Sequence, residues 1–475
     1  MNVTFLGAFP CLVRSDGTRT SAPEGRMRTV EQPLDDEPRR LAQPKEVVHF
    51  WRWLSLITAS GLGLRLFVVV LSRHEKVTGD GYEWSAQGNL NAAGHWFVSP
   101  FNLRPDALRP PGWAMILTVW AWLGQHSWFS QQILACLIGS ATVLLVGLCA
   151  RQMTGDRAGL VAAGIAAGYA AMWLNERALL SEVLLLPEIA VFLLLVYGFR
   201  DNPSLRGAAI LGGMCGIMAM TRSEQILIFP LVILPVVLVA TWGSWRRAVA
   251  WLAVAVVVLL VVIAPWTIFN LGRFQRPVLL SNGFGSAVAE ANCRPTYYGP
   301  DIGYGEVACL YPYYGGDQSI ADGKYLHNGV TYAESHLNRL PVVLFAREGR
   351  TFGFWNPFQQ TTLDAQWMST WVGVTRLAMV SYWLLLVPAF VGLVALRRRG
   401  IPLYPLLAFV LTTAVTVAPG IGDPRYRAAA EVPLVLLAAT GIDALISRRR
   451  ALSPPRGQPV TPIEPTPPTT VVSER

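Results

Sequence analysis

Acidic and basic side chains recur in the short polar segments that separate long apolar runs of this sequence. The first segment contains Asp80 and Glu83 and closes with Arg109, while Glu182 and Arg222 lie at the ends of later apolar runs. Arginine suits phosphate because its planar guanidinium makes paired, charge-assisted hydrogen bonds, and a carboxylate can accept a proton from a hydroxyl group. These residue types predict a site for an anionic ligand rich in oxygen, such as a sugar joined to a lipid phosphate.

Two further residues complete the predicted site. Asn270 lies where a long polar segment begins, and Arg425 lies in the last polar turn, Gly422–Arg427. Each of these side chains also has a plain structural interpretation. Arginines at helix ends commonly extend toward lipid headgroups, and an acid just outside a membrane span can simply be solvated.

The elements that must position these residues are apolar helices. The chain has 475 residues, of which 52% are hydrophobic and only 15% are charged, whereas soluble proteins carry about 25% charged residues. Runs of about 18 or more apolar residues predict membrane spans, and about ten or eleven such segments are present. They lie at roughly 51–72, 111–126, 130–150, 157–173, 179–199, 207–220, 224–242, 247–269, 376–396, 401–418 and 428–446. The predicted fold is an all-α, polytopic transmembrane bundle.

The distribution of arginine predicts an orientation. Arg246–Arg247, Arg397–Arg399 and Arg448–Arg450 mark cytoplasmic loops by the positive-inside rule, which places segments 73–110 and 271–375 on the outer side. Two cytoplasmic tails require an even number of crossings. We therefore expect segment 111–126 to enter the membrane without crossing it or to form one broken element with 130–150, unless its boundaries are misplaced. Within the first outer loop, apolar residues recur at helical spacing from Tyr82, which predicts a helix on the membrane surface.

The domain boundaries follow from composition. We expect a disordered cytoplasmic tail at 1–48, a transmembrane domain at 49–447, and a disordered proline-rich cytoplasmic tail at 448–475. Met27 is an alternative start, and no cleavable signal peptide is evident. The net charge of +9 does not indicate nucleic acid, because the basic residues lie at helix ends.

Two cysteines share the large outer loop. Cys293 and Cys309 lie in segment 271–375, and we predict that they form a disulfide if that loop faces an oxidising compartment. Their spacing matches no zinc motif, and nothing in the sequence suggests a metal or another cofactor.

The order of these features resembles the GT-C class of membrane glycosyltransferases, specifically family 39. This family includes the protein O-mannosyltransferases and the bacterial lipid A aminoarabinose transferase. The resemblance rests on an acid after the first span (Asp80), a surface helix, and a basic-Pro-Pro turn at Arg109-Pro110-Pro111. Glu182, Arg222 and Pro265-Trp266 then follow in the family's order, so that the likeness covers roughly residues 50–285. The protein O-mannosyltransferases carry adjacent acids where this chain has Asp80-Gly81, which leaves the role of Glu83 open.

The resemblance implies a GT-C bundle that transfers a sugar, mannose- or pentose-like, from a polyprenyl-phosphate carrier to an acceptor outside the cytoplasm, without a metal. The acceptor would be a glycolipid, a cell-envelope polymer or a protein. Asp80 would be the catalytic base. The substrate-binding residues would be Glu83, Arg109, Glu182, Arg222, Asn270 and Arg425.

Two other classes of function remain open from the sequence. A transporter or flippase of lipid-linked saccharides would place ionisable residues along a path across the membrane, whereas here they gather on one side. A non-catalytic assembly subunit would keep the fold and bind the donor without turnover. The predicted location is the plasma membrane, with the site on the extracytoplasmic side.

Overall fold

The computed structural model describes residues 49–452, with side chains for residues 49–449. The chain divides into a unit at Met1–Gln43, which lies outside the described residues, and a unit at Pro44–Arg475, which contains every element below. The expected disordered tails therefore lie almost entirely outside the described residues. Within them the fold is all-helical, and the β-bridge between Val98 and Pro105 is isolated.

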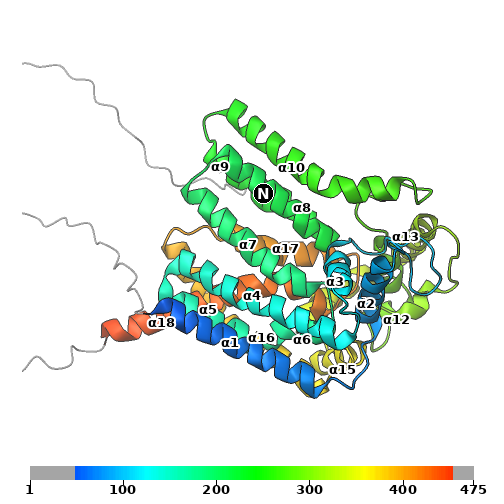
Figure 1. Ribbon diagram of the computed structural model, residues 1–475, viewed down its shortest axis with the longest axis horizontal. Coiled ribbons are helices and arrows are strands. Elements are labelled where there is room, and N and C mark those ends of the chain that lie inside the picture. The colour runs from blue at the N-terminus through cyan, green and yellow to red at the C-terminus, as the bar shows by residue number, and fades with distance from the viewer. Residues whose placement is uncertain (1–48, 453–475) are drawn as a thin grey trace, which may run out of the picture. The chain divides into compact units, whose positions relative to one another are not determined.

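Seven segments are long and apolar enough to cross a membrane. They are α1 (Phe50–Leu71), α4 (Trp128–Thr154), α7 (Glu182–Asp201), Ser223–Ala240 with its α9 (Leu234–Ala240), α10 (Trp245–Leu271), α16 (Val372–Arg398) and Pro424–Arg449, which contains most of α18 (Ala428–Leu452). An eighth span results if α5 (Asp156–Gly168) and α6 (Ala170–Arg177), bent by 44° at their junction, are counted as one. The chain is thus a multi-pass membrane protein, and the predicted all-α class of fold is confirmed (Figure 1).

Three apolar helices are shorter: α3 (Gly112–Trp122), α8 (Leu205–Thr221) and α17 (Tyr404–Val417). At 1.5 Å per residue, the 11 residues of α3 extend over only about 16 Å, roughly half of the ~30 Å hydrocarbon core of a bilayer. This length agrees with the expectation that segment 111–126 does not cross alone. Segments 207–220 and 401–418 are predicted spans, but the helices that form there, α8 and α17, also fall short of the usual length of a membrane crossing.

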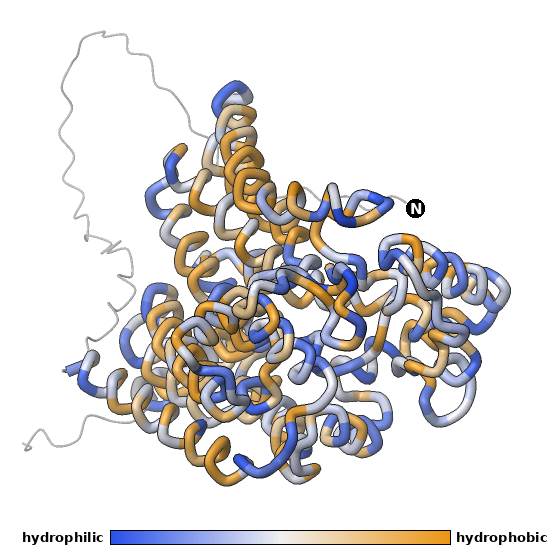
Figure 2. Tube along the Cα trace, turned by 45° about the vertical axis from the view of Figure 1, so that its right-hand side comes forward, coloured by the Kyte–Doolittle hydropathy of each residue, from blue (hydrophilic) through white to orange (hydrophobic). Residues whose placement is uncertain are grey.

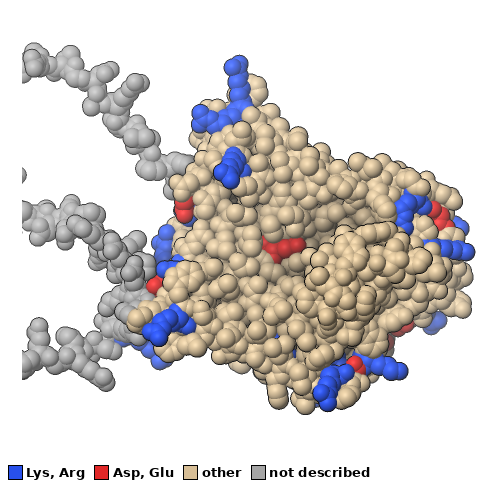
Figure 3. Space-filling view, viewed as in Figure 1, with Lys and Arg blue, Asp and Glu red and all other residues tan. Residues whose placement is uncertain are grey.

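Apolar side chains cover the outside of the bundle as well as its interior. On α10 the residues Val257, Leu260 and Val261 are all more than half exposed. Figure 2 shows hydrophobic residues along the bundle helices, and Figure 3 shows that charged side chains on the viewed face lie mostly at its ends. An apolar surface between two charged ends suits a lipid environment, in which long helices satisfy their own backbone hydrogen bonds.

Small residues allow the closest helix contacts. A Cβ atom on Gly392 of α16 would lie 1.8 Å from the Leu437 carbonyl oxygen, and one on Gly441 of α18 would lie 1.9 Å from the Pro388 oxygen. Likewise, a Cβ atom on Gly212 of α8 would lie 2.1 Å from the Ala255 oxygen of α10. Glycine at these positions lets the backbones approach closely, as is common in membrane helix pairs.

The segment predicted as a large polar loop forms a helical insertion, which we define as residues 272–371. It contains α11 (Phe284–Ala291), α12 (Arg294–Tyr297), η3 (Val307–Leu310), α13 (Gln318–Ser335), α14 (Leu340–Thr351) and α15 (Pro357–Trp367). The side chains of Tyr297, Ile302, Val343 and Ala346 form a small core of its own. With the surface helix α2 (Gly79–Ala92), this insertion gathers at one end of the bundle (Figure 1).

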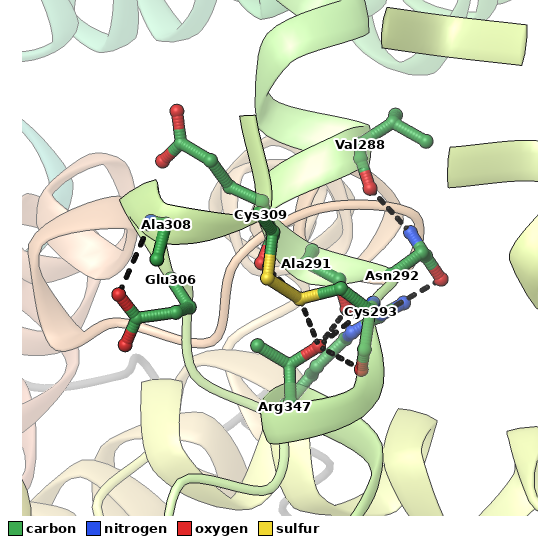
Figure 4. The surroundings of a disulfide bond; sticks show 10 residues. Val288, Ala291, Asn292, Cys293, Glu306, Ala308, Cys309 and Arg347 are labelled. Carbon is green, nitrogen blue, oxygen red and sulfur yellow. Dashed lines mark hydrogen bonds between the residues drawn. A yellow bond between two sulfur atoms is a disulfide. The ribbon is translucent and has the colours of Figure 1, made fainter. Parts of the chain in front are cut away.

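Arg347 of α14 and a disulfide join parts of the helical insertion. Cys293 and Cys309 are bonded, at a separation of 16 positions (Figure 4). Arg347 is fully buried and donates hydrogen bonds to the Ala291 oxygen, to the Asn292 side chain at 2.9 Å, and to the Ala418 oxygen at 2.6 Å. The insertion is therefore fixed to the C-terminal end of α17, just before the polar turn that leads into α18.

Candidate active site

Asp80 lies in the first turn of α2, where the helix N-terminus favours a negative charge. Gly79 before it has φ +56°, a left-handed conformation that glycine adopts at little cost. One carboxylate oxygen of Asp80 accepts a hydrogen bond from Arg109, and the other accepts one from Arg425. Asp80 thus joins two arginines that are far apart in the sequence.

Gly81 explains why a second acid does not follow Asp80. A Cβ atom at this position would lie 2.0 Å from the carbonyl oxygen of Ala178 and 2.8 Å from Val77. No side chain fits there while α2 keeps its place. The departure from the adjacent acids of the protein O-mannosyltransferases is therefore a packing feature of this chain.

Arg109 connects Asp80 to the second acid of α2. Its Nη1 atom donates to Oε2 of Glu83 at 2.5 Å, and the guanidinium carbon lies 5.4 Å from the ring centre of Trp84. Arg109 precedes the Pro-Pro turn into α3, whose first residue, Gly112, lies against the carbonyl of Met220. This contact places the end of α8, and with it the following Arg222, near the same site.

Glu182 is the first residue of α7 and its side chain is fully buried. Its Oε1 atom accepts hydrogen bonds from Nη1 of Arg222 and from Nε of Arg425, both at 2.6 Å. The Nε atom of Arg222 in turn donates to Glu224 at 2.5 Å. Arg425 therefore bridges Glu182 to Asp80.

These contacts form one continuous chain of ion pairs, which we call the acid–arginine network. In order, its members are Glu83, Arg109, Asp80, Arg425, Glu182, Arg222 and Glu224. Asp80 and Arg109 remain 24% and 23% exposed, so a ligand can contact them. Three guanidinium groups in an accessible, partly dehydrated site are suited to binding phosphate oxygens.

The electrostatics of the network favour its charged form. Burial acts to raise the pKa of the Asp80 carboxyl, but the charges and hydrogen bonds of Arg109 and Arg425 hold that pKa well below its usual range. Burial acts to lower the pKa of Arg109, but Asp80 and Glu83 raise it above its ordinary value. At neutral pH the site thus contains ionised acids and arginines in contact.

Two cavities flank the network. One, of about 60 Å³, is lined by Arg425, Arg427, Glu431 and Asp364, together with apolar residues of α6 and α16. The other, of about 20 Å³, is lined by Glu83, Trp84, Asp106 and Arg109. Arg425 therefore lines open space at one end of the Asp80 contacts, and Glu83 and Arg109 line open space at the other.

Asn270 does not join the network. It is buried at the end of α10, and its side-chain nitrogen and oxygen have no hydrogen-bond partner among the described residues. The other candidates, Asp80, Glu83, Arg109, Glu182, Arg222 and Arg425, all belong to the network. The network also contains Glu224, which is not among the predicted site residues although it lies two positions after Arg222 at the start of an apolar run.

Comparison with known proteins gives this arrangement a family context. Residues 108–269 match the family model described as dolichyl-phosphate-mannose-protein mannosyltransferase. The resemblance to the GT-C glycosyltransferases is confirmed. The matched region contains Arg109, Glu182 and Arg222 but not Asp80 or Arg425. No curated protein sequence is significantly similar to this chain.

Solved structures share the fold at low sequence identity. The Archaeoglobus fulgidus oligosaccharyltransferase in its apo form has a TM-score of 0.50 and 14% identity, covering 85% of this chain and 52% of that one. The same organism's AglB, in complex with an inhibitory peptide and a dolichol-phosphate, has a TM-score of 0.50 and 13% sequence identity, and the match covers 85% of this chain and 51% of that one. ArnT from Cupriavidus metallidurans bound to undecaprenyl phosphate has a TM-score of 0.43 and 17% sequence identity, and the match covers 83% of this chain and 79% of that one. This chain spans about half the length of the oligosaccharyltransferase. At this low sequence identity the similarity shows a shared fold alone.

Proposed function

We propose that this protein is a membrane glycosyltransferase that takes a sugar from a polyprenyl-phosphate carrier and transfers it to an acceptor hydroxyl. The observation that carries the proposal is the acid–arginine network at one end of an apolar bundle. A lipid-linked donor can keep its chain in the bilayer while its phosphate meets the arginines at the bundle end. The family model matched by residues 108–269 supports the same class of donor.

Six of the seven members of the network have a proposed role. Arg109, Arg222 and Arg425 bind the donor phosphate and stabilise it as a leaving group, because fixed positive charges act where negative charge develops. Glu83 and Glu182 hold these arginines in place. Asp80 lies at the reaction centre, and the resemblance to family 39 assigns it the role of base. Asn270 remains a proposed substrate contact, through its unpartnered buried amide.

The proposed setting is the plasma membrane, with the network on the extracytoplasmic side and both tails in the cytoplasm. The arginines at 246–247 and 397–399 support this orientation by the positive-inside rule. The proposed boundaries are those of the sequence analysis: tails at 1–48 and 448–475 around a transmembrane domain at 49–447. Mannose- and pentose-like sugars are the proposed donors, and the acceptor is a glycolipid, envelope polymer or protein.

Sugar transfer by the purified full-length chain tests this proposal. The protein in lipid nanodiscs is given polyprenyl phosphates that carry mannose or a pentose, and release of free polyprenyl phosphate is measured with extracted envelope glycolipids and polymers as acceptors. We expect acceptor-dependent release with at least one donor. Movement of the intact lipid-linked sugar across vesicles without bond cleavage would instead support a transporter, and donor binding without turnover would support an assembly subunit.

A further inference from the structure

A cavity of about 60 Å³ lies beside the acid–arginine network, and Arg425 forms part of its wall. Its other walls come from α6, α15, α16 and the start of α18. These helices are neighbours in the fold, because α16 packs against α6, α15 and α18 (Figure 1). A water molecule needs about 10–15 Å³ of such space, so this cavity has room for about four to six of them, a volume comparable with one sugar ring. The cavity of about 20 Å³ beside Arg109 has room for only about one or two.

Two buried side chains that line the larger cavity have oxygen atoms without a partner. Asp364, on α15, is 7% exposed; its Oδ1 atom accepts a hydrogen bond from Gln360 at 2.7 Å, whereas Oδ2 bonds no described residue. Asn175, on α6, is 5% exposed; its amide nitrogen makes only a long bond of 3.5 Å to the Ala171 oxygen, and its Oδ1 atom bonds no described residue. Buried polar atoms are nearly always hydrogen-bonded. Two unpartnered oxygens at one cavity therefore indicate a ligand rich in hydrogen-bond donors, such as hydroxyl groups.

The charges in the cavity wall are balanced by their own neighbours. Arg425 bonds two acids of the network, and Nε of Arg427 donates to Oε1 of Glu431 at 2.7 Å. Burial and Asp423 raise the pKa of Asp364 well above its usual range, so that this carboxyl group takes up a proton more readily than a solvated one. The two arginines also oppose the binding of a metal cation. A neutral ligand therefore suits the cavity best.

The carboxyl group of Asp364 is held in one orientation. Gln360, which bonds it, accepts a hydrogen bond at its own side-chain oxygen from Nη1 of Arg350 at 2.8 Å. Arg350 is fully buried and also donates to the carbonyl oxygens of Ile302 at 2.6 Å and Pro300 at 2.8 Å. A side chain that is already ordered loses little conformational entropy when it binds a ligand, which favours selective recognition.

The helix that carries Asp364 also contacts the start of α2, where Asp80 lies. The Thr78 hydroxyl donates to the carbonyl oxygen of Trp367 at 3.4 Å, and a Cβ atom on Gly79 would lie 3.0 Å from the Trp367 ring. Trp367 follows Asp364 by three positions, which is about one helical turn. The cavity therefore has a fixed position relative to the acid at the proposed reaction centre.

We propose that this cavity binds the sugar ring of the lipid-linked donor, and that Asp364 and Asn175 form hydrogen bonds with its hydroxyl groups and so select the sugar. This inference rests on the proposed function, in which Arg425 binds the donor phosphate. The sugar is bonded directly to that phosphate, so a phosphate at Arg425 brings the ring to the cavity that Arg425 lines. Ala378 and Met379 of α16 supply an apolar wall for the C–H groups of the ring.

The affinities for the donor and for bare polyprenyl phosphate test this assignment, because only the donor carries a sugar. Both are measured without acceptor on the full-length protein in lipid nanodiscs, by competition with radiolabelled polyprenyl phosphate, and the donors carry mannose or a pentose. We expect Asp364→Asn and Asn175→Ala each to weaken donor binding about 10-fold, which corresponds to one hydrogen bond, and to leave the affinity for bare polyprenyl phosphate within about threefold. In transfer, the same variants should discriminate less between the two sugars, measured as a ratio of kcat/KM.

Asp301→Asn is the matched control, because Asp301 accepts a hydrogen bond from Gln359 of α15 at 2.9 Å, as Asp364 does from Gln360, yet does not line the cavity. It should leave both affinities unchanged. Equal losses for the donor and for bare polyprenyl phosphate in the two cavity variants would overturn this inference alone. Unchanged donor affinity would also overturn it, and a raised KM for the acceptor would then assign the cavity to the acceptor. Failure of the unmodified protein to transfer sugar from any carrier would overturn the proposed function itself, and this inference with it.

Discussion

The guanidinium of Arg425 donates from Nε to Oε1 of Glu182 at 2.6 Å, across 243 positions of sequence. The same guanidinium bonds Asp80 through Nη1. The polar turn before α18, the start of α7 and the start of α2 therefore converge on one side chain. A substitution of Arg425 should therefore remove hydrogen bonds from both Asp80 and Glu182.

Arg425→Lys should weaken donor binding and transfer. A lysine ammonium lacks the planar fork with which Arg425 bonds two carboxylates from separate nitrogens. Loss of one charge-assisted hydrogen bond corresponds to about 1.5–3 kcal/mol, or roughly a 10- to 100-fold loss in kcat/KM. Steady-state kinetics with the lipid-linked donor measures this, and Arg376→Lys, at an exposed arginine outside the network, is the control. Equal effects of the two substitutions on kcat/KM would show that Arg425 does not contribute specifically to donor binding or transfer.

Asp80→Asn should insert and fold but lose sugar transfer. An amide keeps one acceptor oxygen and adds a donor, so that either Arg109 or Arg425 loses its bond to residue 80 and is held only by Glu83 or Glu182. We expect a loss of about 10²-fold or more, the size found when a group that stabilises developing charge is removed. Detergent size-exclusion profiles monitor folding, and release of polyprenyl phosphate monitors activity. Retained activity would exclude Asp80 from the reaction centre.

Gly81→Ala should disturb the position of Asp80 through packing alone. The new methyl group would lie 2.0 Å from the Ala178 oxygen, so α2 must shift. Overpacking of this kind typically costs about 1–3 kcal/mol, which thermal unfolding in nanodiscs can detect together with reduced transfer. Gly63→Ala is the control, since a Cβ atom there meets no atom within 4 Å. A Gly81→Ala protein as stable and active as the Gly63→Ala protein would contradict this account.

Much of the site was predictable because charge is rare in apolar helices. Asp80, Glu83, Arg109, Glu182, Arg222 and Arg425 stand out at the ends of apolar runs, and the structure brings all of them into one network. Their pairing was not predictable, because Asp80 and Arg425 are 345 positions apart. The number of membrane spans was also not predictable from hydrophobicity, since α8 and α17 are apolar but shorter than the 18 residues expected of a membrane-spanning helix.

The helices of the insertion were not predictable from the sequence. Residues 272–371 are rich in glycine, tyrosine and asparagine, a composition that indicates loops, yet tertiary contacts stabilise helices there. Arg347 illustrates the cause, because a buried arginine that bonds three carbonyl-type oxygens is indistinguishable in sequence from a solvated one.

The Cys293–Cys309 pair supplies a test of the insertion itself. Closing a loop of 16 residues removes conformational freedom from the unfolded chain, worth about 3 kcal/mol in the chain-entropy model. The Cys293→Ser/Cys309→Ser protein should therefore show faster amide hydrogen exchange in α12 and η3, because the bond joins Cys309 of η3 to Cys293, which directly precedes α12. Reducing agent should loosen the unmodified protein in the same places and leave the double variant unchanged. Mass spectrometry of unreduced peptides that finds both cysteines as free thiols would show that the disulfide does not form.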